Sequence, residues 1–335
     1  MTRLNETVPV EQTRINLDLK DRRILAMLDW DARLSIAKLA KEVRLSKNAV
    51  AYRISRLEKA GIILGYYPVI DFGRLGYYSH RVQLSLHNAD ARVKQEIEKY
   101  ISNPDSEISW SVWVRGVADL LIVIWTRSLK EFKSIFNKFN TRFGKYIEKR
   151  LFTTTYGFEQ YPYRFLLGKN DWQSMIIDEG PSFHLDKLDS RILASLNSNA
   201  RKSCTEIAKE TGSNYKTVQY RIKKLAKNHV LIGTRAFINH TAFGYNYYKF
   251  MLYFTHYSDE EYHKLKNYLR GLQETVYIVF HVNSDLDAEM LFKSDNEFFE
   301  FIDGLQEKFP GLIKNFEYFL FTRTIQIEYV HQLDA

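Results

Sequence analysis

Two stretches of the chain place basic and amide side chains at helical spacing, each directly after a residue that can begin a helix. The first follows Ser46 and presents Lys47 and Asn48, and the second follows Asn214 and presents Lys216 and a glutamine. A lysine can donate to guanine and an asparagine or glutamine can pair with adenine, whereas cations farther along such a helix reach phosphates. These residue types predict contact with double-stranded DNA. The candidate DNA-contacting residues are Ser46, Lys47, Asn48, Tyr52, Arg53, Arg56 and Lys59 in the first stretch and Asn214, Tyr215, Lys216, Gln219, Tyr220, Arg221, Lys223, Lys224 and Lys227 in the second.

Both stretches belong to a duplicated segment. Leu17–Tyr77 recurs as Leu185–Tyr245 without a gap, and roughly two in five positions are identical, more than drift gives over this length. The first copy holds about 12 Lys and Arg against 7 Asp and Glu, and the second about 11 against 4. Since the whole chain of 335 residues carries a formal net charge of +8, its basic charge is concentrated in the two copies. The pattern predicts at least two domains and a polyanionic partner.

Each copy is predicted to hold three helices and a wing. The second helix spans Ile36–Val43 in the first copy and Cys204–Thr211 in the second, with apolar residues at helical spacing. The third helix begins after the two cap residues named above. A short strand pair at Ile62–Ile70, and again at Val230–Ile238, fits the wing of a winged helix. Each copy is therefore predicted to be a winged helix-turn-helix domain.

The two third helices differ in the side chains that they present to solvent. Tyr52 and Tyr220 correspond, but nearly every other outward position has changed between the copies. Because different side chains read different base edges, we predict an operator whose two halves are not identical.

The remainder of each copy repeats an order of elements. Between Tyr78 and Glu159, and again between Tyr247 and Tyr329, the pattern predicts strand, helix, strand, strand, helix and strand. This order is the split ferredoxin-like arrangement. The predicted fold class is α+β, with two winged helix-turn-helix domains each followed by a ferredoxin-like (βαββαβ) domain. The predicted boundaries are residues 1–16 for a tail, 17–75 and 76–167 for the first pair of domains, 168–184 for a linker, and 185–243 and 244–335 for the second pair.

Two strand segments indicate that the sheets are covered on both faces. Leu120–Trp125 and Val276–Phe280 are continuously apolar rather than alternating. A sheet with helices on one face and water on the other shows alternation. We therefore predict that the two sheets pack together, within the chain or between chains.

The chain shows no constellation of catalytic residues. It has no glycine-rich phosphate loop, no His-Glu-x-x-His metal motif and no nucleophile elbow. Cys204 is its only cysteine, which is typical of a reducing compartment. We therefore expect no catalytic residue, metal or cofactor, and a cytoplasmic protein that is not an enzyme.

At this point the sequence resembles the leucine-responsive/asparagine-operon regulators (Lrp/AsnC) of bacteria and archaea. The pattern from Asp18 to Leu28 resembles the first helix of that family. The pattern from Ser46 to Tyr66 resembles the family's recognition helix and wing. Val114-x-Gly116-x-x-Asp119 resembles the turn of the family's effector domain. The match covers nearly the whole chain twice, whereas family members usually carry one such unit and pair through their ferredoxin-like domains. The resemblance implies a DNA-binding regulator in the form of a fused pseudo-dimer, with homo-oligomers possible through the same domains.

The resemblance also implies an effector, commonly an amino acid. The residues at the corresponding turn are Arg115, Gly116 and Asp119. In the second copy Ser284-Asp285-Leu286-Asp287 replaces the glycine turn, so an effector is expected for the first half only.

Two other functions stay open. Siroheme decarboxylases share this architecture, although Ala32-Arg33-Leu34-Ser35 departs from their Phe-Pro and Arg-Pro-Phe pattern. The second alternative is a protein-interaction module, in which one winged helix has become a docking surface for another protein. The positive balance of the second copy argues against it.

Overall fold

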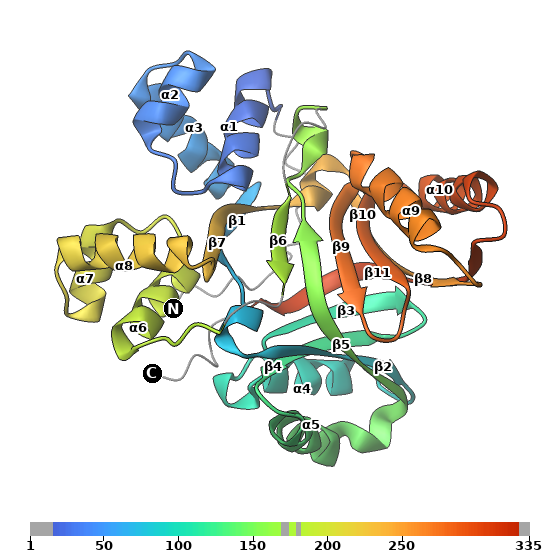
Figure 1. Cartoon of the computed structure of the whole chain (residues 1–335). Coiled ribbons are helices and arrows are strands. Elements are labelled where there is room, and N and C mark those ends of the chain that lie inside the picture. The colour runs from blue at the N-terminus through green and yellow to red at the C-terminus, as the bar shows by residue number, and fades with distance from the viewer. Residues whose placement is uncertain (1–15, 169–173, 179–181, 328–335) are drawn as a thin grey trace.

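The computed structural model describes residues 16–168, 174–178 and 182–327. The predicted tail 1–16, apart from its last residue, and parts of the predicted linker lie outside the described residues. Figure 1 shows two helix-turn-helix units on one side of the molecule and a body of sheet and helices on the other. The first unit consists of α1 (Leu19–Trp30), α2 (Ile36–Val43), α3 (Lys47–Lys59) and β1 (Ile63–Ile70); the second of α6 (Lys187–Ser198), α7 (Cys204–Thr211), α8 (Tyr215–Lys227) and β7 (Leu231–Ile238). The predicted α+β class is confirmed.

The recognition helices α3 and α8 begin where the sequence predicts. The Ser46 hydroxyl accepts the backbone N–H of Ala49 at 3.1 Å, and the Asn214 side chain accepts that of Thr217 at 2.9 Å. Such caps satisfy N–H groups that have no partner inside a helix.

The predicted strand pair of each wing is wrong. Ile63–Ile70 and Leu231–Ile238 each form one continuous strand, and β1 pairs antiparallel with β7, so that Tyr66 lies opposite Ala236. Each strand also completes the core of the other copy: Ala236 and Ile238 pack with α1–α3, and Ile70 packs with α6–α8. The physical reason is that neither strand turns back on itself: each continues through a short 3-10 turn into the barrel, which leaves its edge to pair with the strand of the other copy. We call this two-stranded element the shared ribbon.

The two predicted ferredoxin-like sheets join into one closed barrel. The strand order is β2-β4-β3-β11-β8-β10-β9-β5-β6, and β2 also pairs with β5. The first half contributes β2 (Tyr78–Leu86), α4 (Ala91–Ile101), β3 (Trp110–Gly116), β4 (Leu120–Thr126), α5 (Leu129–Phe143) and β5 (Ile147–Gln160); the second contributes β8 (Asn246–Phe254), α9 (Asp259–Gly271), β9 (Thr275–His281), β10 (Leu286–Phe292), α10 (Asp295–Lys308) and β11 (Ile313–Ile327). The pairs β3–β11 and β5–β9 connect the halves.

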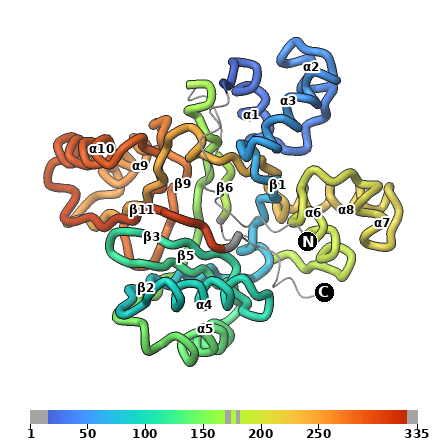
Figure 2. The backbone as a smooth tube through the Cα atoms, turned by 180° about the vertical axis from the view of Figure 1, so that it is seen from behind, coloured from blue at the N-terminus to red at the C-terminus, as the bar shows by residue number. Residues whose placement is uncertain are grey.

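Both faces of this sheet are covered, as the apolar strands predict. Every residue of β4 is buried. Helices α4 and α5 cover the outside of one half and α9 and α10 the outside of the other (Figure 2). Inside, Val112 and Leu121 of the first half pack with Met251 and Phe319 of the second. The prediction that the sheets pack together is thus confirmed within one chain.

One short strand lies where the sequence predicts a linker. Strand β6 (Met175–Asp178) pairs antiparallel with the end of β5. Met175 and Ile177 pack against Val69 of the shared ribbon. These two apolar residues at strand spacing fasten the segment between the copies to the ribbon.

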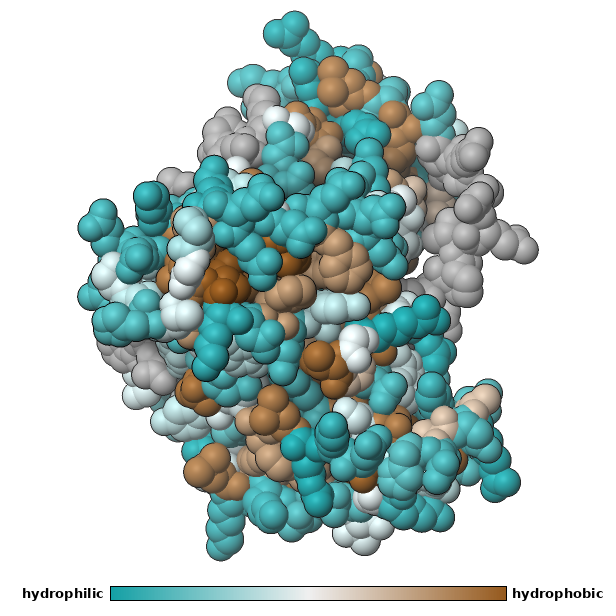
Figure 3. All heavy atoms as spheres, turned by 90° about the vertical axis from the view of Figure 1, so that its right-hand side faces the viewer, coloured by the Kyte–Doolittle hydropathy of each residue, from teal (hydrophilic) through white to brown (hydrophobic). Residues whose placement is uncertain are grey.

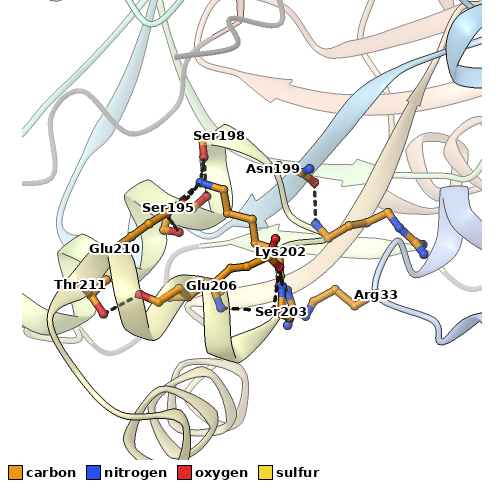
Figure 4. Close-up of polar contacts among 11 residues, drawn as sticks. Arg33, Ser195, Ser198, Asn199, Lys202, Ser203, Glu206, Glu210 and Thr211 are labelled. Carbon is orange, nitrogen blue, oxygen red and sulfur yellow. Dashed lines mark hydrogen bonds and ion pairs between the residues drawn. The ribbon is translucent and has the colours of Figure 1, made fainter. Parts of the chain in front are cut away.

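Reciprocal arginines tie the two helix-turn-helix units together. Arg33 of the first unit donates to the carbonyl oxygens of Ala200 at 2.6 Å and Lys202 at 2.8 Å. The matching Arg201 donates to the carbonyl oxygen of Ala32. Figure 4 shows Arg33 reaching Lys202 and Ser203 at the start of α7, beside a polar group formed by α6 and α7. The duplicated Ala-Arg dipeptide therefore forms a pseudo-symmetric joint.

Replacing Arg33 with alanine is expected to loosen this joint. Two carbonyl groups of this part-buried joint would lose their donor, at up to about 1–3 kcal/mol for a group left buried and unsatisfied. Urea unfolding would measure the loss, with Arg23→Ala, an exposed arginine of α1, as the control. Equal stability of the two variants would show that the joint adds nothing.

The surface gives no sign of a single broad apolar face in the view of Figure 3, where apolar side chains lie in separate patches among hydrophilic ones. Among the described residues, no helix combines the length and apolarity that crossing a membrane requires.

Candidate nucleic-acid interface and cavity

Helix α3 presents most of its predicted contact residues to solvent. Lys47, Asn48 and Lys59 are exposed, and Tyr52 is 69% exposed. Val50, Ile54 and Leu57 on the opposite side are buried in the core of the first unit. An amphipathic helix of this kind leaves one full face available for a groove.

Helix α8 presents a comparable face with different side chains. Lys216, Lys223 and Lys227 are exposed, Tyr220 is 64% exposed and Tyr215 is 49% exposed. The Gln219 amide donates to the Tyr215 hydroxyl at 3.3 Å. Lys224 is half-buried, with its ammonium group 5.4 Å from the centre of the Phe183 ring. Lys224 is therefore less available to a phosphate than its exposed neighbours.

Three arginines predicted to contact phosphate also form ion pairs within their units, and their contact with phosphate stays a prediction. Arg53 bonds Asp18 at 2.8 Å and Asp21 at 2.7 Å, and Arg56 bonds Asp21 at 2.5 Å. In the second unit Arg221 pairs in the same way with Asp186 and Asp189.

The physical reason for these ion pairs is the burial of one carboxylate in each unit. Asp21 and Asp189 each belong to a capping box at the start of α1 or α6, and their side chains are 1% exposed. A buried carboxylate needs a cationic partner. Arg53, Arg56 and Arg221 thus hold the first helix of each unit on its recognition helix.

The turn predicted to hold an effector is occupied by internal contacts. Gly116 has a φ of +127°, and a Cβ there would lie 2.2 Å from the backbone oxygen of Tyr318. The Asp119 carboxylate accepts the backbone N–H of Leu86 at 2.7 Å. Arg115 is exposed. Gly116 therefore allows the close approach of β3 to β11, and Asp119 ties the turn to β2. Effector binding at this turn stays a prediction.

A cavity of about 210 Å³ lies between one end of the barrel and the shared ribbon. Ribbon residues such as Tyr67, Arg235 and Phe237 form one side. Barrel residues that include Trp110, Trp125, Arg81, Tyr247 and Glu289 form the rest. The lining therefore comes from both halves of the chain and from both kinds of domain.

A buried ion pair anchors the ribbon side of this cavity. The Arg235 guanidinium contacts an oxygen of Asp29 at 2.5 Å, and both side chains are at most 3% exposed. The second oxygen of Asp29 accepts the backbone N–H of Tyr163 at 2.6 Å. The positions that correspond by the repeat are Tyr67 and Asn197, so the pair exists once and breaks the pseudo-symmetry.

The barrel interior next to the cavity holds a cluster of charged side chains that sequence reasoning missed. Lys249 lies 2.7 Å from Asp287 and 3.7 Å from Glu289. Arg81 lies 3.6 Å from Glu289, and His281 lies 3.2 Å from Asp287. Burial, together with the charges of Lys249 and Arg81, lowers the pKa of His281 well below its ordinary value. One signal was available: Asp287 and Glu289 are two apart on a strand and so share a face.

His240, which also lines the cavity, predicts a pH dependence of stability. Burial lowers its pKa from 6.5 to about 4. A histidine with a lowered pKa takes up its proton more readily in the unfolded chain, so its contribution destabilises the fold as pH falls from about 6.5 toward 4. Unfolding free energies at pH 7 and pH 5 should therefore differ less in His240→Asn than in the wild type. An unchanged difference would contradict this assignment.

A solved structure matches the fold over nearly the whole chain. The siroheme decarboxylase NirDL superposes with a TM-score of 0.63 at 15% identity, covering 95% of each chain, and its complex with an iron-uroporphyrin III analogue gives 0.62. This likeness establishes a shared fold. It also overturns our expectation that the chain is not an enzyme, because the whole architecture, with both helix-turn-helix units, occurs in an enzyme.

The two helix-turn-helix units also match known families. Residues 17–63 match a family described as winged helix-turn-helix DNA-binding, and residues 185–226 match the AsnC-type helix-turn-helix domain. The leucine-responsive regulatory protein of Rhizobium meliloti is 30% identical over 122 residues, which are 36% of this chain and 77% of that protein. The transcriptional regulator LrpA of Pyrococcus horikoshii is 32% identical over 117 residues, 32% of this chain and 83% of that protein. With its two DNA-binding units and these relatives, the chain belongs to the Lrp/AsnC family of transcriptional regulators.

Proposed function

We propose that the protein is a sequence-specific transcriptional regulator that reads one asymmetric operator with both recognition helices. The observation that carries this proposal is the presentation of α3 and α8, each with an exposed basic face, on units held together by the shared ribbon and the Arg33–Arg201 joint. In a paired regulator the distance between recognition helices sets the spacing of the two half-sites. Here one chain supplies both helices.

The asymmetry follows from the exposed residues. Lys47 and Asn48 on α3 correspond to Tyr215 and Lys216 on α8, so the donors and acceptors offered to base edges differ. Each good bidentate contact discriminates against the wrong base by about 1–3 kcal/mol. A half-site suited to α3 is therefore a poor site for α8.

The test begins with selection of bound fragments from the host genome by the full-length protein, followed by footprinting. Two palindromes are then built, each from one half-site in two copies. We expect the natural operator to bind more tightly than either palindrome, by roughly tenfold or more. A palindrome that binds as tightly as the natural operator would contradict asymmetric reading, and the absence of any selected sequence would contradict the regulator.

A second candidate function is an enzyme acting on a tetrapyrrole. The whole-length likeness to the decarboxylase NirDL supports it, together with the cavity that Arg81 lines beside His240, because an arginine suits a substrate carboxylate. Adding siroheme or iron-uroporphyrin to the protein and recording the visible spectrum tests it. A shift that saturates at one equivalent supports the enzyme, and a spectrum equal to the sum of its components contradicts it.

A further inference from the structure

Arg81 has buried hydrogen-bond donors that its long ion pair with Glu289 does not satisfy. The residue is 9% exposed and lines the cavity. Its Nε and Nη1 atoms are buried without a hydrogen-bond partner among the described residues. The nearest carboxylate, Glu289, is 3.6 Å away, which is too long for a hydrogen bond. Glu289 already accepts a hydrogen bond from the Tyr247 hydroxyl at 2.9 Å.

A second unpaired group on the cavity wall is also a donor. The Nε1–H of Trp125 is buried and has no acceptor within the described part of the chain. No side-chain acceptor of the described cavity lining is buried without a partner. Because buried polar groups normally find a complement, two donor residues without an acceptor indicate a ligand that brings one. A carboxylate is the acceptor that a guanidinium binds most strongly.

The rest of the lining selects the body of such a ligand. Trp110, Phe158, Phe237, Tyr277 and Phe321 surround the space with aromatic surface. Aromatic walls favour a flat ring through stacked and edge-to-face contacts. A cavity of about 210 Å³ suits a body of one or two rings, since a cavity of about 150 Å³ is enough for benzene.

We propose that this cavity binds a small aromatic carboxylate, with the carboxylate on Arg81 and the ring among the aromatic side chains. The site differs from the turn at Arg115, Gly116 and Asp119. Neither the position of this site nor the chemical class of its ligand depends on the protein being a transcriptional regulator.

The position of the cavity couples it to the recognition helices, a step that rests on the proposed function. Tyr67 of β1 and Phe237 of β7 line the cavity, and both strands follow directly from a recognition helix, α3 or α8. A ligand bound against the shared ribbon therefore favours one relative orientation of the two recognition helices. By linkage, the factor by which the ligand changes operator affinity equals the factor by which operator changes ligand affinity.

Calorimetry on the full-length protein without DNA tests the ligand assignment. The probes are phenylacetate and its uncharged analogue 2-phenylethanol, and quenching of tryptophan fluorescence reports contact with Trp110 and Trp125. We expect one phenylacetate per chain and binding roughly ten- to a hundredfold tighter than that of the alcohol. Equal binding of acid and alcohol, or no binding of either, overturns the assignment.

Variants locate the site. Arg81→Gln should remove most of the preference for the acid, whereas Arg150→Gln, an equal loss of charge at an exposed position of β5 in the same barrel, should leave it unchanged. Since Arg81→Gln could impair folding, Thr241→Trp, at an exposed residue of the cavity lining, provides a second way to block the cavity. Retained binding in a folded Arg81→Gln variant overturns the assignment of this site. A loss of binding caused by Arg150→Gln overturns it as well.

Two further measurements separate the proposals. Titration with iron-uroporphyrin distinguishes a tetrapyrrole site: if it binds and phenylacetate does not, the small-ligand assignment fails and the enzyme gains support. Operator affinity with and without phenylacetate tests the coupling, and an unchanged affinity contradicts it. Failure to find any operator would remove the regulator while leaving the calorimetric result intact.

Discussion

Replacing Asp29 with alanine is expected to lower the free energy of unfolding by about 3–5 kcal/mol, because it leaves a buried guanidinium without its carboxylate. Arg235 and Asp29 are both almost fully buried and 2.5 Å apart. Asp29 also accepts the Tyr163 backbone N–H, so that donor would lose its partner as well. Urea unfolding followed by circular dichroism measures the change.

The repeat supplies the control for this experiment. Asn197 occupies the position of Asp29 in the second copy and is half-buried, so Asn197→Ala should cost much less. The double variant Asp29→Ala with Arg235→Met removes both charges and should recover part of the loss. If Asp29→Ala were no worse than Asn197→Ala, the pair would not contribute to stability in the manner described.

Removing the three exposed lysines of α8 is expected to weaken DNA binding by two to three orders of magnitude. Lys216, Lys223 and Lys227 point away from the core of the second unit. If each neutralises one phosphate, the slope of log affinity against log salt falls by about 0.9 per residue, which is roughly eightfold in affinity per contact at 0.1 M salt. Titration of a labelled operator at several salt concentrations with the triple alanine variant gives both quantities.

A matched loss of charge elsewhere separates local contact from overall charge. Lys130 and Lys133 on α5 and Lys264 on α9 are also exposed, and they lie on the helices outside the barrel (Figure 1). Their triple alanine variant should keep nearly the full slope. Equal slopes for the two variants would mean that the lysines of α8 do not contact DNA.

Local chemistry explains which parts of the fold were predictable. The cap residues Ser46 and Asn214 and the regular apolar spacing behind them placed the helices correctly, because helix starts depend on neighbouring residues. The continuous apolar run of β4 correctly indicated a sheet covered on both faces. Both signals lie within a dozen residues of the feature they predict.

Pairings between distant segments could not be predicted in the same way. Strand β1 has the composition of a wing hairpin, and its actual partner, β7, begins at Leu231. Which edge a strand pairs with depends on the arrangement of whole domains, and a single sequence does not encode that locally. For the same reason the ion pairs of Arg53 and Arg56 were not predicted, since their partner Asp21 lies 32 and 35 residues away on α1.

The cavity was missed because its residues come from many elements. Arg81, Glu289 and Trp125 lie on three different strands, and none belongs to a motif with fixed spacing. The alternation of Asp287 and Glu289 on β10 was the one local sign that an inward face was polar. The partners of these carboxylates, Lys249 and Arg81, lie on β8 and β2, far away in the sequence.

The closed barrel also has a consequence for how the chain is made. Strands β3 and β5 of the first half pair with β11 and β9 of the second, which the ribosome synthesises last. Until then the N-terminal half exposes two open strand edges, and such edges invite pairing with other chains. During translation this half therefore depends on rapid completion of the polypeptide or on protection by chaperones.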